Sequence, residues 1–166
     1  MKNKREERLT LCRARLDFGS VVMYLRDGKV VRAELKSDFE GKGDRNLGKR
    51  IRRVWREGFN KSGFQFDLQN LSGFARRVLW GCAQIPFGRV MSYGELARAI
   101  GKPGAARAVG QVMAHNPIPL FFPCHRVVAK NGRLGGFAGG AEMKIRLLRS
   151  EGWQIKGRGF NARLVK

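Results

Sequence analysis

The sequence predicts an α/β protein of two lobes: a small N-terminal α/β lobe with an antiparallel sheet, and a mostly helical C-terminal lobe. Its 166 residues suit one compact unit or two small lobes, and 43% hydrophobic residues are enough for a core. Strand and hairpin patterns fall in the first third of the chain, and helical patterns dominate after it. We place the boundary in the polar segment 69–73, which divides the chain into residues 1–71 and 72–166.

Two apolar segments in the N-terminal lobe, residues 21–25 and 30–35, predict a β-hairpin. They flank Asp27 and Gly28, which both tolerate the positive φ that a type I′ turn requires. Cys12 is expected in a strand before this hairpin, and residues 64–68 alternate as a half-buried strand does. These segments together predict the sheet.

A helix is predicted after the hairpin. Asp44 is a suitable N-cap after the loop 41–43. Apolar side chains then recur at helical spacing, at Leu47, Ile51, Val54 or Trp55, and Phe59.

Three helices are predicted in the first part of the C-terminal lobe. The first carries Phe74, Val78 and Cys82 on one stripe and ends before Pro86, so Cys82 is interpreted as a core residue. The second begins with a capping box at Ser92 and Glu95, ends at the break 101–104, and is followed by a third over residues 105–114. Two short helices joined by a glycine-containing turn are a helix-turn-helix candidate.

The leading face of the third helix carries small residues and one long side chain, Arg107. Such a face can approach a DNA backbone closely or lie in a widened minor groove, where little sequence is read. Close helix–helix packing is the alternative, but an arginine on a buried packing face would need a partner.

The charge points to a polyanionic partner. Lys and Arg number 34 against 13 Asp and Glu, which gives a formal net charge of +21 and a pI near 11.3. Nucleic acid is the favoured partner, and a solvated basic surface is the alternative.

No apolar run approaches the ~20 residues that span a bilayer. Three cysteines without a CxxC pair argue against disulfides and a zinc site, and favour a reducing cytosol.

Cys124 is the candidate nucleophile. It follows an apolar run and precedes His125, and a cysteine reacts as the thiolate, which needs a nearby base or positive charge. Neighbours in an extended chain point to opposite sides, so His125 would act through a turn at 123–124 or a bridging water. Glu151, after a helix over 142–150, is the candidate that orients His125. The alternative is a buried thiol beside a surface histidine.

The sequence Pro-Cys-His-Arg-Val at 123–127 stands in a longer segment, 116–127, that resembles the O6-alkylguanine-DNA alkyltransferases. Residues 92–93, 107–110 and 147–152 extend the resemblance over about 72–152, whereas residues 1–71 match only in layout. The resemblance implies a ribonuclease H-like first lobe and a winged-helix-like second lobe. It also implies direct-reversal repair: an alkyl group passes from O6 of a flipped alkylguanine in double-stranded DNA to Cys124, once per protein molecule. It implies that the protein uses no cofactor or metal and does not bind a membrane. It also implies a cytoplasmic, nucleoid-associated location and a monomeric state, with clustering on DNA left open.

The resemblance also assigns roles to single residues. Cys124 accepts the alkyl group, His125 is the base through a water, Glu151 orients His125 and Asn116 braces the site. Tyr93 crowds the target phosphate and protonates the leaving base, and Arg107 fills the vacated stack. Ser92, Ala105, Ala106 and Gly110 complete the DNA-binding set. The pocket set is Met113, Pro119, Val127, Phe137, Ala138 and Gly139.

Two residues depart from the family pattern in the segment 135–140, which resembles a lid. Phe137 stands where many members have Tyr, and Ala138 where many have Ser, so a hydroxyl donor to guanine O6 is replaced by a backbone N–H. Two other functions stay open: a non-catalytic sensor of alkylguanine, which Cys124 argues against, and a cysteine hydrolase that uses Cys124, His125 and Glu151.

Overall fold

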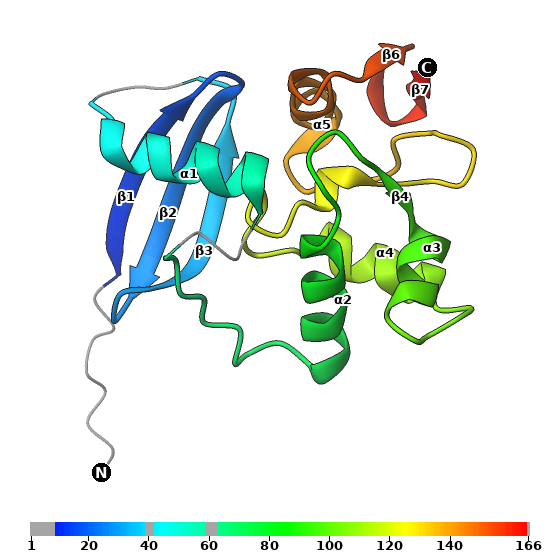
Figure 1. Ribbon diagram of the computed structural model, residues 1–166, viewed down its shortest axis with the longest axis horizontal. Helices are drawn as coiled ribbons and strands as arrows, with labels where there is room; N and C mark the ends of the chain where they lie inside the picture. Colours follow the sequence, from blue (N-terminus) through cyan, green and yellow to red (C-terminus); the bar gives the residue numbers. More distant parts are fainter. Residues whose placement is uncertain (1–8, 39–41, 59–62, 166) are drawn as a thin grey trace.

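A three-stranded antiparallel sheet opens the chain (Figure 1). The computed structural model describes residues 9–38, 42–58 and 63–165. The strands β1 (Thr10–Leu16), β2 (Gly19–Arg26) and β3 (Lys29–Lys36) pair in the order β1-β2-β3. Asp27 and Gly28 have φ of 49° and 76°, as the hairpin prediction requires. Cys12 lies in β1, paired with Met23. The predicted hairpin and the predicted strand before it are therefore confirmed.

Helix α1 (Arg45–Glu57) lies across the sheet, and Asp44 is its N-cap. The Asp44 carboxylate accepts hydrogen bonds from the N–H groups of Asn46 and Leu47. The predicted apolar stripe is buried in the core: Leu47, Ile51, Val54 and Trp55. Phe59, which was expected to continue it, and Gly41 in the preceding loop lie outside the described residues.

The strand predicted over residues 64–68 is wrong in extent, because the segment makes only a single parallel bridge between Phe66 and Val30. The N–H of Val30 donates to Gln65 O, and the N–H of Asp67 donates to Val30 O. The rings of Phe64 and Phe66 pack on Phe121, at centroid distances of 5.1 and 5.5 Å. The alternating pattern thus reflects contact with an apolar side chain of the second lobe rather than membership of the sheet. Further along β3, the N–H of Ala33 donates to Pro117 O, so another segment occupies that edge.

The predicted helices of the second lobe are all present. Helix α2 (Gly73–Ala83) buries Val78 and Cys82, α3 (Tyr93–Ala99) begins with the predicted Ser92–Glu95 capping box, and α4 is Ala106–Ala114. Just before α3, the short strand β4 (Met91–Ser92) pairs in parallel with β5 (Val127–Val128). That pairing joins the start of the helix-turn-helix to the segment that follows Cys124.

The chain ends with a 3-10 turn η2 (Cys124–Arg126), helix α5 (Gly140–Ser150), and a hairpin of β6 (Gln154–Lys156) and β7 (Arg163–Val165) joined through the 3-10 turn η3 (Gly159–Asn161). One hydrophobic cluster runs through both lobes, with members such as Met23, Trp55, Leu79, Phe121 and Leu147. The two lobes therefore share a core. The ribonuclease H-like and winged-helix-like descriptions and the boundary at 71/72 stay predictions. Within the described ranges, no helix is long and apolar enough to cross a membrane.

Candidate active site

Cys124 begins the 3-10 turn η2, which is the turn that the sequence required next to His125. Its side chain is buried, with an exposed fraction of 2%. The Asn116 Nδ2 donates to Cys124 Sγ at 3.1 Å and to Phe122 O at 2.7 Å, while its Oδ1 accepts from the N–H of Ile118 at 3.0 Å. All the polar atoms of this amide are engaged, so Asn116 holds the sulfur at a fixed position.

His125 and Glu151 form a buried pair. Glu151 is the C-cap of α5, as expected, and its Oε1 lies 2.7 Å from His125 Nε2. An ionised carboxylate only accepts hydrogen bonds, so Nε2 carries the ring proton and donates it. The other ring nitrogen, Nδ1, has no hydrogen-bond partner among the described residues. Nδ1 is therefore the basic atom of this imidazole.

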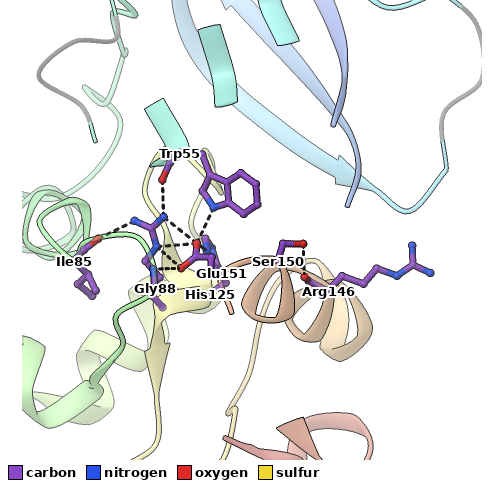
Figure 2. Close-up of polar contacts among 8 residues, drawn as sticks. Trp55, Ile85, Gly88, His125, Arg146, Ser150 and Glu151 are labelled. Carbon is purple, nitrogen blue, oxygen red and sulfur yellow. Dashed lines mark hydrogen bonds and ion pairs between the residues drawn. The ribbon is translucent and has the colours of Figure 1, made fainter. Parts of the chain in front are cut away.

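Glu151 is the centre of a hydrogen-bond network that reaches both lobes (Figure 2). Trp55 Nε1, from α1, donates to its Oε1 at 2.7 Å, and the backbone N–H of Gly88 donates to its Oε2 at 3.0 Å. The Trp55 ring is fixed by edge contacts with Phe18 and Phe87, at centroid distances of 5.0 and 5.4 Å. The first lobe thus supplies a hydrogen-bond donor to the Glu151 carboxylate.

Arg126 is the charged partner of Glu151. Its Nε and Nη2 donate to the carboxylate at 2.9–3.1 Å, its Nη1 donates to Ile85 O and its Nη2 to Trp55 O, both at 2.8 Å. A buried guanidinium is tolerated only when it is paired and hydrogen-bonded in this way. Arg126 therefore locks Glu151 and the end of α1 into one arrangement.

These contacts set the charge states of the pair. Burial alone would raise the pKa of Glu151, but the hydrogen bonds and charges of His125 and Arg126 outweigh it and hold that pKa at about 2. Burial lowers the pKa of His125, and the hydrogen bond that His125 donates to Glu151 only partly offsets this. At neutral pH the site holds an ionised Glu151 and a neutral His125, which is the state that can accept a proton.

Burial raises the pKa of the Cys124 thiol, while the Asn116 hydrogen bond and the charge of Lys144 act in the opposite direction. Lys144, on α5, is fully buried, and its Nζ donates to Val127 O at 2.7 Å, Leu134 O at 2.5 Å and Gly136 O at 3.4 Å. Burial lowers the pKa of Lys144 to about 8. At rest the sulfur is therefore a protonated thiol beside a buried cation.

Tyr93, the first residue of α3, lies between α4 and the segment 135–140. A Cβ placed on Gly110 would lie 3.8 Å from the Tyr93 ring, and one on Gly135 would lie 2.7 Å from its hydroxyl. Burial and the nearby Cys124 raise the pKa of Tyr93, so its phenol keeps its proton. Gly135 has a φ of 66°, so both its backbone and its lack of a side chain fit this close approach.

The expected pocket residues divide into a buried and an exposed group. Phe137 is buried, and its ring lies where a side chain on Gly139 would have to be, 2.7 Å from a Cβ placed there. Ala138 and Gly139 are exposed. Met113, Pro119 and Val127 are buried. Cys124 is only 2% exposed, so a base can reach its sulfur only if the residues that cover it move.

The predicted DNA-binding residues are more exposed than those of the buried network. Arg107 is exposed on α4, and Ala105, Ala106 and Gly110 are half-buried beside it. The Ser92 hydroxyl accepts from the N–H of Glu95, so it serves first as a helix cap. The structure places this surface on α3 and α4, outside the buried network of Glu151.

The sequence did not predict that Trp55, Gly88 and Lys144 belong to the site. It also did not predict which residue Arg126 binds. Arg126 had a usable signal, because a buried arginine needs a carboxylate partner and the second lobe has few acids. Lys144 stands on the apolar side of α5 between Met143 and Ile145, which is an unusual place for a lysine. The hydrogen bonds of Trp55 and Gly88 leave no local pattern in the sequence. In the ranges 9–38, 42–58 and 63–165, no group of three or more His, Cys, Asp or Glu residues could hold a metal ion.

Comparison with known proteins decides the family. The model of the 6-O-methylguanine DNA methyltransferase DNA-binding domain matches residues 73–153, the part that carries the whole Cys124–His125–Glu151 arrangement. Residues 73–153 belong to this family. A methylated-DNA–protein-cysteine methyltransferase of Salmonella typhimurium is 52% identical over 82 residues, which is 49% of this chain and 48% of that protein. The chain thus spans about half the length of the curated relatives it matches.

Solved structures also resemble this chain, and the OGT structure extends the similarity to both lobes. The Mycobacterium tuberculosis OGT, crystallised in complex with DNA, superposes with a TM-score of 0.69 at 29% identity, covering 86% of this chain and 92% of that one. The Schizosaccharomyces pombe Atl1, crystallised with damaged DNA containing O6-carboxymethylguanine, has a TM-score of 0.51 at 32% identity and covers 58% of this chain and 92% of that one. The two-lobe α/β fold is therefore shared with the OGT structures.

Proposed function

We propose that this protein repairs DNA by moving an alkyl group from O6 of guanine to its own Cys124, once per molecule. The observation that carries the proposal is the contact of Asn116 with the sulfur, directly beside the His125–Glu151 pair. The printed names of the relatives, methylated-DNA–protein-cysteine methyltransferase, support the same activity.

The proton of the thiol leaves first. Burial keeps Cys124 protonated at rest, so a base must act when the substrate is present. His125 Nδ1 is the basic atom, and it takes the proton through one bridging water. The imidazolium that forms is stabilised by the ionised Glu151, and Arg126 keeps Glu151 in place. Glu151 is thus a positioning residue for His125.

The sulfur then attacks the alkyl carbon in line with the C–O6 bond. A C–S bond forms, the C–O6 bond breaks, and its electron pair stays on the guanine ring. The Tyr93 phenol, which keeps its proton because its pKa is raised, donates to that ring and lets guanine leave as a neutral base. The C–S bond of the thioether that remains does not react with water, so the thiol is not regenerated and the protein is consumed.

The DNA lies on α3 and α4, which we describe as a winged-helix-like helix-turn-helix. An O6-alkyl group is not accessible inside the duplex, so the nucleotide is extruded at a cost of a few kcal/mol. Arg107 occupies the vacated place in the stack, and Tyr93 crowds the phosphate of the extruded nucleotide. Ser92, Ala105, Ala106 and Gly110 allow the backbone to approach closely. Phosphates are attracted by surrounding cations at Arg89, Arg98, Lys102, Lys130 and Arg133.

The extruded base enters beneath the segment 135–140. The pocket is formed by Met113, Pro119, Val127, Phe137, Ala138 and Gly139, and it opens only when the lid moves. Lys144 ties the carbonyl of Gly136 in the lid, and that of Leu134 just before the lid, to that of Val127, so it sets the resting position of the lid. The protein acts as a monomer with a ribonuclease H-like lobe 1–71 and a catalytic lobe 72–166, near the nucleoid in the cytoplasm.

The intact mass of the protein after exposure to a duplex with one O6-methylguanine tests this proposal. An alkyltransferase gains one methyl group and keeps it, a non-catalytic sensor gains none, and a cysteine hydrolase shows at most a transient adduct while it turns over. Cys124→Ser abolishes the gain if the proposal holds, and Cys82→Ser does not. Retained transfer by the Cys124→Ser variant would exclude the proposal.

A further inference from the structure

Two adjoining cavities form one groove on the side of the molecule where α1 begins. One, of about 460 Å³, lies between the β1–β2 turn and α5; the other, of about 690 Å³, lies between that turn and the start of α1. Arg15 and Asp17 line both, so the cavities are continuous. We call this surface the basic groove, because its lining includes Arg15, Lys42, Arg45, Lys49, Arg52, Arg146 and Arg149.

The carboxylates of the basic groove are occupied. Asp44 caps α1, Asp17 lies 3.8 Å from Arg52, and Asp38 accepts from the Ser37 hydroxyl at 3.2 Å. In the part of the chain that the structure describes, Arg45, Lys49 and Arg149 have no carboxylate partner. Seven cations against three engaged carboxylates leave an excess of four positive charges in one groove.

The cations of α1 form a row. The helix carries six Lys and Arg and one acid, and its apolar face is buried on the sheet, so the charges project outward. Arg45, Lys49 and Arg52 are four and three residues apart, which places each about 4.5–6 Å from the next along the helix. A row of fixed charges fits an extended polyanion better than it fits a single small anion.

The chemistry of the groove favours phosphate over other anions. Five of its seven cations are arginines, whose planar guanidinium binds phosphate oxygens in pairs. Its one aromatic lining residue, Phe18, is 4% exposed and offers no stacking platform for bases. The groove is therefore suited to a sugar–phosphate backbone, without reading sequence.

The basic groove and α4 lie on opposite sides of the molecule. In Figure 1 the start of α1, the β1–β2 turn and α5 lie along the upper edge, and α3 and α4 lie at the lower right. We propose that the basic groove binds the phosphate backbone of a second DNA segment while α4 holds the first, so that one protein bridges two duplexes. This inference rests on the proposed function in that α4 is taken as the surface for the first duplex. It also gives a role to five of the 17 basic residues before position 61.

A capture assay tests the bridging. A duplex fixed to beads is saturated with protein, washed, and exposed to a second, fluorescent duplex. The wild type is expected to retain the second duplex, and K49Q/R146Q/R149Q is expected to retain at least about tenfold less. The matched control R32Q/K156Q/R158Q removes the same charge outside both surfaces and is expected to retain as much as the wild type. The dependence of capture on salt should weaken by about 0.9 in log–log slope for each lost phosphate contact.

Methyl transfer to Cys124 is measured by mass in the same samples, so failure of the proposed function is seen separately from failure of the bridging. Normal transfer by K49Q/R146Q/R149Q also shows that this variant is folded. Three results overturn the proposal: no capture by the wild type, equal loss in the groove variant and its control, or displacement of the second duplex by poly-glutamate as efficiently as by unlabelled DNA. The last would indicate an acidic protein as the partner.

Discussion

Trp55 Nε1 donates a hydrogen bond of 2.7 Å to Glu151 Oε1, across 96 positions of sequence. The indole comes from α1 in the first lobe, and the carboxylate ends α5 in the second. The same oxygen also contacts His125 Nε2 and Arg126 Nη2. The first lobe therefore helps to position the His125–Glu151 pair, rather than serving only as a support for the second lobe.

Trp55→Phe tests this contact. Phenylalanine keeps an aromatic ring between Phe18 and Phe87 but removes the donor to Glu151. Loss of one hydrogen bond to a charged group costs about 1.5–3 kcal/mol. We expect single-turnover methyl transfer to slow by about tenfold or more, with the lower limb of its pH profile displaced. Trp80→Phe, on the outer side of α2, is the control, and an equal slowing by both variants would contradict the role of Trp55.

Lys144→Met removes the donor that ties three carbonyls together. Buried carbonyls without a donor cost about 1–3 kcal/mol each, partly relieved by relaxation of the lid. We expect the free energy of unfolding in urea to fall by about 2–4 kcal/mol, and the segment 134–136 to lose protection in hydrogen exchange. Lys130→Met, at an exposed lysine, should change neither. Unchanged exchange at 134–136 in the Lys144 variant would rule out the tether.

Acid should destabilise the protein through Glu151. Its pKa is about 2 in the fold against an ordinary 4.5, so below pH 4.5 the unfolded chain binds its proton first. The stabilisation is complete above pH 4.5 and is lost as the pH falls toward 2, at about 1.4 kcal/mol per unit and on the order of 3 kcal/mol in all. Urea unfolding across this range measures it. Glu142→Gln, at an exposed carboxyl on the same helix, should keep the full decline, while a flat profile in the wild type would contradict the buried pair.

Arg107→Ala separates base extrusion from chemistry. The exposed side chain acts only when a duplex is present, by filling the place of the extruded base. We expect transfer from a methylated duplex to slow by tenfold or more, and transfer from free O6-alkylguanine base to stay within about twofold of the wild type. Lys102→Ala, in the turn before α4, should mainly weaken binding in a salt-dependent way. Equal losses on duplex and free base would remove the finger role of Arg107.

Local patterns predicted most of the fold. The Asp27–Gly28 turn, the Asp44 cap and the Ser92–Glu95 capping box each depend on a few adjacent residues, and the structure confirms each of them. The segment 64–68 shows the limit. Its alternation was real, but the partner of its rings is Phe121, which lies in the other lobe, and no local pattern specifies such a partner.

The site divides in the same way. Cys124, His125 and Glu151 were identified from residue type, spacing and family resemblance, and the structure brings His125 and Glu151 into contact. Lys144 and Trp55 were missed because their partners are backbone carbonyls and a distant carboxylate. The roles of the pocket and DNA-binding residues remain predictions that the variants above test.

The most direct test is a titration of the protein with excess duplex carrying O6-methylguanine, followed by peptide mapping. We expect methyl loss from the DNA to stop at about one group per protein molecule, with that group on the sulfur of Cys124 and none on Cys12 or Cys82. Methyl loss that continues beyond the amount of protein, or a methyl group found anywhere other than Cys124, would contradict a single transfer to the buried thiol.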